Sequence, residues 1–176
     1  MNLKKYSILV IDDDVDVLTA VRLLLRTEVK EVVTEKNPEN IPSLLASRAF
    51  DLVLLDMNYK ASINTGNEGI YWLKRIKDIK PDIAVVMITA YGDIDLAVRS
   101  LKEGASDFVV KPWHNEKLVS AIEETLKQKA AGKNKTSIGS KGDDIIGKEL
   151  LGESEVMEDI FYKIEKIAPT DANILI

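Results

Sequence analysis

The stretch LVLLDMN, residues 52–58, predicts the central strand of the fold. Four apolar residues, Leu52 to Leu55, lead directly into Asp56. An unbroken apolar run is typical of a strand that is buried on both faces of a sheet. Open α/β sheets bind their ligands at the carboxyl ends of such strands, which is where Asp56 falls. An aspartate in this place can also simply cap a loop, so the rest of the chain has to decide between the two roles.

The composition limits the class of protein. The chain has 176 residues, 45% of them hydrophobic and 30% charged, which suits one domain with an appendage. Its net charge of −5 argues against nucleic-acid binding as its main role. It has no cysteine, so disulfides and thiolate ligands are excluded, and we expect a cytoplasmic protein. The first apolar run ends in three aspartates, so we predict neither a signal peptide nor contact with a membrane.

Apolar runs alternate with segments of helical spacing along the chain. After the first run the apolar residues recur at helical intervals, at Val17, Leu18, Val21, Leu24 and Leu25. The predicted strands cover residues 7–11, 31–35, 51–56, 83–88 and 107–110. Five alternations of strand and helix predict a parallel sheet with helices on both faces and right-handed crossovers. We therefore predict the flavodoxin-like (βα)5 class of α/β fold, with strand order 2-1-3-4-5.

Three adjacent aspartates, Asp12, Asp13 and Asp14, follow the first predicted strand. Any one of them could cap the next helix, because aspartate suits the positive end of a helix dipole. One residue is enough for that purpose. Three like charges side by side cost free energy unless a cation offsets their repulsion, which indicates a second role for this cluster.

The predicted topology brings polar residues from four strand ends together. Asp12 and Asp13 end the first strand, Asp56 the third, Thr89 the fourth and Lys111 the fifth. Crowded carboxylates without cysteine form a site of hard oxygen ligands that suits Mg²⁺. A carboxylate, a divalent ion, a lysine and a hydroxyl are the parts that hold a phosphoryl group during in-line transfer. Asp56 would then be the nucleophile and form an acyl phosphate.

Four segments resemble the signature segments of two-component receiver domains, over roughly residues 5–128: SILVIDDD, LVLLDMN, VMITAYGD and GASDFVVKPW. The resemblance implies that Asp56 is the phosphoacceptor and that Asp12 and Asp13 are an acidic pair for Mg²⁺. It implies that Asn58 offers its backbone carbonyl to the metal. Lys111 would pair with the phosphoryl group and precede a cis peptide bond.

The resemblance also implies a switch and partners. Thr89 and Phe108 match the pair in which the hydroxyl moves towards the phosphate and the aromatic ring turns inward. A sensor histidine kinase would supply the phosphoryl group. The helix over Ile94–Leu101, with the last strand and helix, would form a homodimer surface. One departure is the connection 57–68 before Gly69, the glycine that we predict opens the third helix, because it is longer than in the family.

The composition changes after the receiver domain, which we place at residues 1–129. Residues 130–145 predict a linker rich in lysine, glycine and serine. Residues 146–176 resemble the start of the AAA+ domain of NtrC-like, sigma-54-dependent activators. We expect a longer parent protein that contacts ATP, DNA and sigma-54 RNA polymerase. This chain stops before the phosphate-binding loop, so we expect it to make none of these contacts. A helix over 155–167 would pack on a neighbour or be poorly ordered.

Two alternatives belong to other classes. A haloacid-dehalogenase-like phosphatase also uses aspartate, threonine and lysine, but it needs a second aspartate where this chain has Asn58. A receiver-like interaction module that is never phosphorylated is the remaining alternative. A dinucleotide-binding domain is disfavoured, because no glycine fingerprint follows the first strand. We expect no enzyme beyond self-phosphorylation and autodephosphorylation at Asp56.

Overall fold

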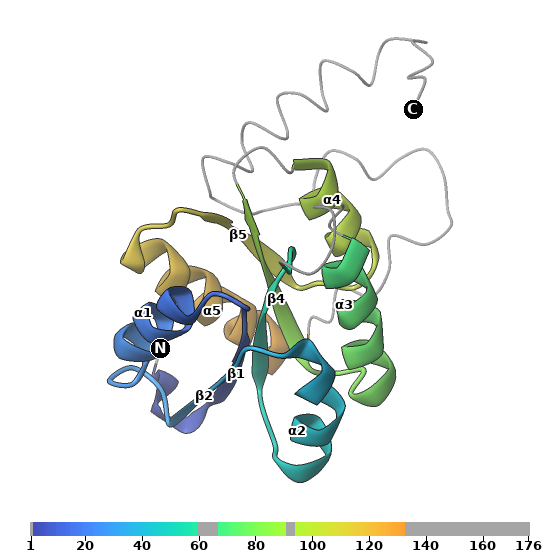
Figure 1. The fold of residues 1–176 in the computed structure, drawn as a ribbon. Coiled ribbons are helices and arrows are strands. Elements are labelled where there is room, and N and C mark those ends of the chain that lie inside the picture. Colours follow the sequence, from blue (N-terminus) through green and yellow to red (C-terminus); the bar gives the residue numbers. More distant parts are fainter. Residues whose placement is uncertain (1, 60–66, 91–93, 133–176) are drawn as a thin grey trace, which may run out of the picture. The chain divides into compact units, whose positions relative to one another are not determined.

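The chain forms an open parallel sheet in a computed structural model that describes residues 2–59, 67–90 and 94–132 (Figure 1). The five strands are β1 (Ser7–Ile11), β2 (Glu31–Glu35), β3 (Leu52–Asp56), β4 (Ala84–Ala90) and β5 (Asp107–Lys111). All neighbours pair in parallel in the order β2-β1-β3-β4-β5. The predicted flavodoxin-like fold and its strand order are confirmed.

Helices cover both faces of this sheet. The α-helices are α1 (Val15–Leu25), α2 (Ile41–Ser47), α3 (Asn67–Ile79), α4 (Ile94–Lys102) and α5 (Asn115–Ala130). Short 3-10 helices cover Leu3–Lys5 (η1) and Pro38–Asn40 (η2). Figure 1 shows α1 and α5 on one face and α2, α3 and α4 on the other. None of the helices in the described ranges has the length and apolar composition needed to cross a bilayer.

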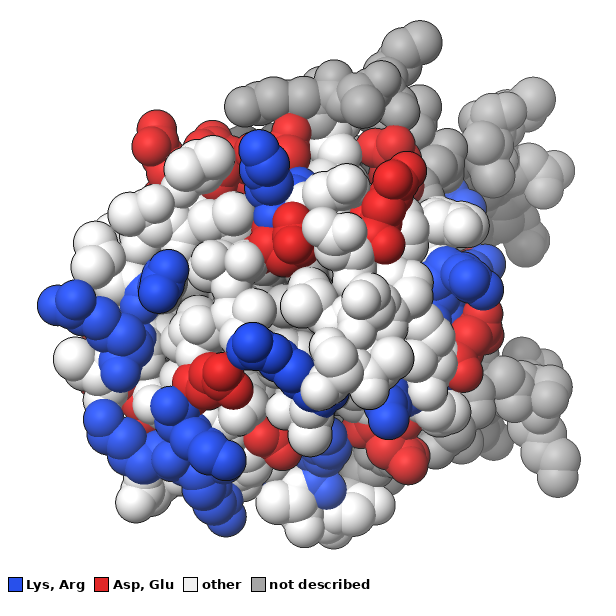
Figure 2. Space-filling view, turned by 60° about the horizontal axis from the view of Figure 1, so that its bottom comes forward, with Lys and Arg blue, Asp and Glu red and all other residues white. Residues whose placement is uncertain are grey.

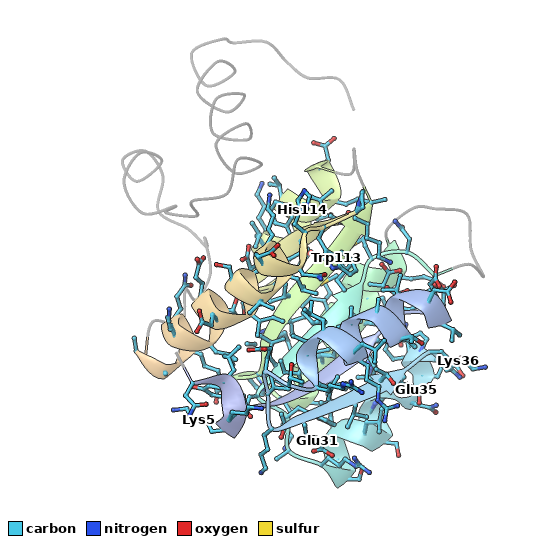
Figure 3. The ribbon with its side chains drawn as sticks, turned by 90° about the vertical axis from the view of Figure 1, so that its left-hand side faces the viewer. Lys5, Glu31, Glu35, Lys36, Trp113 and His114 are labelled. Atoms are coloured by element: carbon cyan, nitrogen blue, oxygen red, sulfur yellow. The ribbon has the colours of Figure 1, made fainter. Side chains whose placement is uncertain are left out.

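The burial of the strands explains their apolar sequences. Every residue of β1 and β3 is buried, because these strands lie inside the sheet with a helical layer on each side. Alternate residues of the strands, including Val10 of β1 and Leu54 of β3, pack with Leu18 of α1 and Ile122 of α5. β2 lies at the edge and is only partly buried (Figure 3, where Glu31 and Glu35 mark its ends).

The cap of α1 separates the three aspartates by role. The Asp14 carboxylate accepts a hydrogen bond of 2.9 Å from the Asp16 N–H and so caps the helix. Asp12 and Asp13 are therefore not needed for capping and remain at the end of β1. At the next helical segment Asn37 is the cap, accepting from the Glu39 N–H, whereas Asn40 makes no side-chain cap hydrogen bond.

Some element limits differ from the sequence expectation. β4 continues through Ala90, so Thr89 lies within the strand instead of following it. α3 begins at Asn67, which makes Gly69 its third residue instead of its first. The other predictions, for the linker over 130–145, the fragment over 146–176 and the helix over 155–167, lie outside the described residues, apart from residues 130–132.

Candidate functional site

The register of the sheet brings the acidic residues of two strands together. Ile11 of β1 pairs with Leu55 of β3, so the next residues, Asp12 and Asp56, lie side by side at the carboxyl ends of these strands. Both carboxylates are buried. One carboxylate oxygen each from Asp12, Asp13 and Asp56 lies within 4.8 Å of the other two, which is the spacing of a shared cation site. The structure therefore places this predicted cluster at one edge of the sheet, as the topology requires.

Lys111 of β5 links these carboxylates. Its ammonium donates hydrogen bonds of 2.7 Å to Asp12 Oδ2 and 2.9 Å to Asp56 Oδ1. β4 lies between β3 and β5, so the Lys111 side chain reaches across the end of that strand. The bond between Lys111 and Pro112 is cis, as the resemblance implies. One ammonium is thus shared between two carboxylates that contribute two negative charges.

Backbone amides hold the two carboxylates in place. The Asp14 N–H donates to Asp12 Oδ1 at 3.0 Å, and the Asn58 N–H donates to Asp56 Oδ2 at 3.3 Å. Each carboxylate therefore uses one oxygen for a backbone amide and the other for Lys111. These carboxylate oxygens are held in fixed orientations, and Lys111 alone does not balance their charge. Such oxygens are suitable ligands for a hard divalent cation such as Mg²⁺.

Burial dominates the electrostatics of the site. Burial, with the charge of Asp12 acting in the same direction and Lys111 opposing both, raises the pKa of Asp56 to about 6. Burial also raises the pKa of Asp12, although its hydrogen bond to Lys111 acts the other way. Burial alone would lower the pKa of Lys111, but its hydrogen bond to Asp12 and the charge of Asp56 together raise it. When both are ionised, the Asp12 and Asp56 carboxylates carry more negative charge than Lys111 can balance. A second cation would supply the missing positive charge.

Thr89 and Phe108, the predicted switch pair, lie on one face of the sheet. Met87 pairs with Phe108 in the register of β4 and β5, and Thr89 is two residues beyond Met87 on the same strand. Both side chains are buried. The Thr89 hydroxyl has no hydrogen-bond partner within the described ranges, so it is available to a new acceptor at the neighbouring Asp56.

The burial of Tyr59 and the backbone contact of Gly69, both beside the site, were missed by the sequence analysis. Tyr59 is 5% exposed, although it lies in the connection that follows the central strand. Burial raises its pKa, with further contributions from the charges of Asp56 and Asp12. Gly69 lies against the backbone of Met57 and donates its N–H to the Met57 carbonyl at 3.1 Å. The aromatic side chain of Tyr59, shortly after Asp56, could have indicated that this residue is buried. No local sequence pattern indicates the contact of Gly69 with Met57.

The parallel fold and the acidic site with its lysine define a receiver domain of a response regulator. Residues 8–123 match the response regulator receiver domain family, and the chain belongs to this family. A crystal structure of the N-terminal signal receiver domain of a two-component response regulator from Bacteroides fragilis is 48% identical, with a TM-score of 0.62. That match covers 68% of this chain and 95% of the other.

Longer regulators match nearly the whole chain. The transcriptional regulatory protein ZraR of Klebsiella oxytoca is 32% identical over 179 residues, covering 100% of this chain and 38% of ZraR. A crystal structure of NtrX from Brucella abortus in complex with ADP is 29% identical, with a TM-score of 0.66. It covers 96% of this chain and 35% of NtrX. The chain thus spans little more than a third of the length of these relatives.

Proposed function

We propose that this chain accepts a phosphoryl group on Asp56 from a sensor histidine kinase, in a Mg²⁺-dependent reaction. The observation that carries the proposal is the double contact of Lys111 with Asp12 and Asp56, next to the carboxylate cluster that includes Asp13. A structural ion pair would need one carboxylate for one lysine. A surplus of buried negative charge around a nucleophilic carboxylate is typical of a site that also binds a cation and a phosphoryl group.

The residues have distinct roles in this reaction. An Asp56 carboxylate oxygen attacks the phosphorus of the donor's phosphohistidine, the phosphorus–nitrogen bond breaks, and its electron pair leaves with the imidazole nitrogen. Asp12, Asp13, Asp56 and the Asn58 backbone carbonyl would hold Mg²⁺, which when bound offsets charge on the phosphoryl oxygens. Lys111 pairs with a phosphoryl oxygen. Water later hydrolyses the acyl phosphate, and we propose no other enzymatic activity for this chain.

The proposed conformational switch depends on the Thr89 hydroxyl. Phosphorylation adds about −1.5 to −2 of charge and new acceptor oxygens next to this hydroxyl. Thr89 then donates to a phosphoryl oxygen, and Phe108 repacks into the space on the same face of the sheet. The affected surface comprises α4, β5 and α5, and we propose that phosphorylation tightens a homodimer through it. Sedimentation velocity with and without a phosphoryl mimic tests this, and an unchanged mass would contradict it.

The parent function is proposed from the relatives. ZraR is a transcriptional regulatory protein, and NtrX of Brucella abortus has been crystallised with ADP. We propose that this receiver controls an attached sigma-54-dependent activator, whose further domains bind ATP, DNA and sigma-54 RNA polymerase in the cytoplasm.

Incubation with acetyl phosphate and Mg²⁺, followed by intact mass, tests the central proposal. We expect the wild-type chain to gain one phosphoryl group and Asp56→Asn to gain none. Asp51→Asn is the matched control, because Asp51 precedes the other end of the same strand and accepts a hydrogen bond from the Ser7 N–H. It should be phosphorylated like the wild type. An unmodified wild-type chain would favour the alternative, a receiver-like interaction module that is never phosphorylated.

A further inference from the structure

Met57, between Asp56 and Asn58, is held from two sides. Its N–H donates a hydrogen bond of 2.8 Å to the carbonyl of Ile88 in β4. Its own carbonyl accepts a hydrogen bond of 3.1 Å from the N–H of Gly69 in α3. Its side chain is fully buried. The peptide units on either side of Met57 are therefore tied to both a strand and a helix.

The contact with α3 is possible only because residue 69 has no side chain. A Cβ atom on Gly69 would lie 2.7 Å from both the Cα and the carbonyl oxygen of Met57. It would also lie 3.0 Å from the Met57 carbonyl carbon. These atoms are backbone and cannot rotate away as a side chain could. Any side chain at position 69 must therefore push α3 from β3 or displace the backbone of Met57.

A displacement of Met57 reaches the site directly. Peptide units are rigid planes, so a shift of one residue reorients the groups on both neighbours. Those neighbours carry the Asp56 carboxylate and the Asn58 carbonyl, and the Asn58 N–H also orients Asp56 Oδ2 at 3.3 Å. The position of α3 at Gly69 is thus coupled to two of the groups that we assign to the cation.

We propose that Gly69 is a positioning residue for the metal site, which sets the Asp56 and Asn58 ligands by holding α3 against Met57. The inference rests on the proposed function, because it assumes that these groups bind Mg²⁺. Met57 and Gly69 lie at the two ends of the connection over 57–68, and their contact fixes the spacing between β3 and α3 at this point.

A comparison of two glycine variants tests the proposal. Gly69→Ala introduces the clash with Met57, whereas Gly104→Ala is a matched control after α4. Gly104 has φ +99°, so alanine is strained there, yet its Cβ would meet only the Lys77 side chain, at 3.7 Å. Mg²⁺ affinity is measured by isothermal titration calorimetry on the full chain, and folding by circular dichroism. We expect Gly69→Ala to bind Mg²⁺ about 10-fold or more weakly, as when other ligand-orienting contacts are lost, and Gly104→Ala to bind normally.

The outcomes separate this proposal from the proposed function. If the wild-type chain itself does not bind Mg²⁺, the proposed function fails. If it binds and folded Gly69→Ala binds equally well, the role of Gly69 is overturned and the proposed function stands. If Gly69→Ala does not fold, hydrogen exchange on the wild-type chain decides. Because coupling is reciprocal, Mg²⁺ should slow exchange of the Gly69 amide but not that of Gly104. Equal exchange of the Gly69 amide with and without Mg²⁺ would overturn the proposal.

Discussion

Lys111 Nζ donates a hydrogen bond of 2.7 Å to Asp12 Oδ2, although the two residues are 99 positions apart in the chain. Asp12 is fully buried and Lys111 is 27% exposed, so the pair lies at the boundary between the core and solvent. The same ammonium also contacts Asp56. The buried carboxylates of Asp12 and Asp56 therefore share one lysine, and this 2:1 ratio of negative to positive charge leads to the predictions below.

Removal of the lysine charge should destabilise the metal-free protein. In Lys111→Met the buried Asp12 and Asp56 carboxylates lose their cation, and we expect the free energy of unfolding to fall by about 3 kcal/mol. Urea unfolding at neutral pH measures this. Lys129→Met is the control, because Lys129 donates to the backbone carbonyl of Asp51 and not to a carboxylate among the described residues, and it should cost about 1 kcal/mol. Mg²⁺ should restore stability more in Lys111→Met than in the control, and equal recovery would contradict a cation site here.

The raised pKa of Asp56 predicts an unusual pH dependence. Burial lifts this pKa to about 6 in the folded protein, from 3.8. Between these values the folded state binds more protons than the unfolded state, so the contribution of Asp56 to stability falls as pH rises through this window. Asp56→Asn should therefore be more stable than the wild type at pH above about 6, by roughly 1–3 kcal/mol without divalent ions.

The advantage of Asp56→Asn should disappear as the pH falls through the same window, because the wild-type carboxyl is then protonated as well. Urea unfolding of both proteins with a chelator, at several pH values, measures the difference. A gap that widens at low pH would contradict this account. Added Mg²⁺ should narrow the gap at neutral pH, since it stabilises the wild-type chain only.

Thr89→Val should separate stability from switching. The buried Thr89 hydroxyl has no partner among the described residues, so its replacement by a methyl group should leave stability unchanged or raise it by up to about 1 kcal/mol. With Asp56 phosphorylated, the variant cannot donate to a phosphoryl oxygen. We expect the phosphorylation-dependent change in the Phe108 ring resonances, measured by NMR, to be lost. A full response of Phe108 in Thr89→Val would exclude the proposed role of the hydroxyl.

Tyr59→Phe should be tolerated or stabilising. The Tyr59 hydroxyl is buried without a hydrogen-bond partner within the described part of the chain, and such a group costs about 1–3 kcal/mol. Its removal should raise the free energy of unfolding by about 1 kcal/mol, as measured by urea unfolding. Tyr71→Phe, at a side chain that is 54% exposed, is the control and should have no effect. A clear loss of stability in Tyr59→Phe would mean that its hydroxyl has an acceptor after all.

The surface of the protein also carries charged side chains. Figure 2 shows one face on which basic and acidic side chains both occur, with the basic ones gathered towards one side. Trp113 and His114 lie just before α5, and Trp113 packs against the core (Figure 3). His114 occupies the N-cap position of α5 but makes no side-chain cap hydrogen bond.

The sequence alone determined the fold and the membership of the acidic cluster. Unbroken apolar runs are required for strands that are covered on both faces, and parallel strands with right-handed crossovers place all their carboxyl ends at one edge. A polar residue at the end of such a run, such as Asp12, Asp56 or Lys111, can therefore be placed without coordinates.

Only the tertiary structure decided how these residues contact one another. That Lys111 bridges Asp12 and Asp56 depends on how far its side chain reaches across β4, and no local pattern encodes that distance. The approach of Gly69 to Met57 likewise arises only when α3 packs against β3, and the burial of Tyr59 is also seen only in the folded chain. Periodicity reports which face of an element is buried, whereas the separation between two backbones is set by the packing of all the side chains between them.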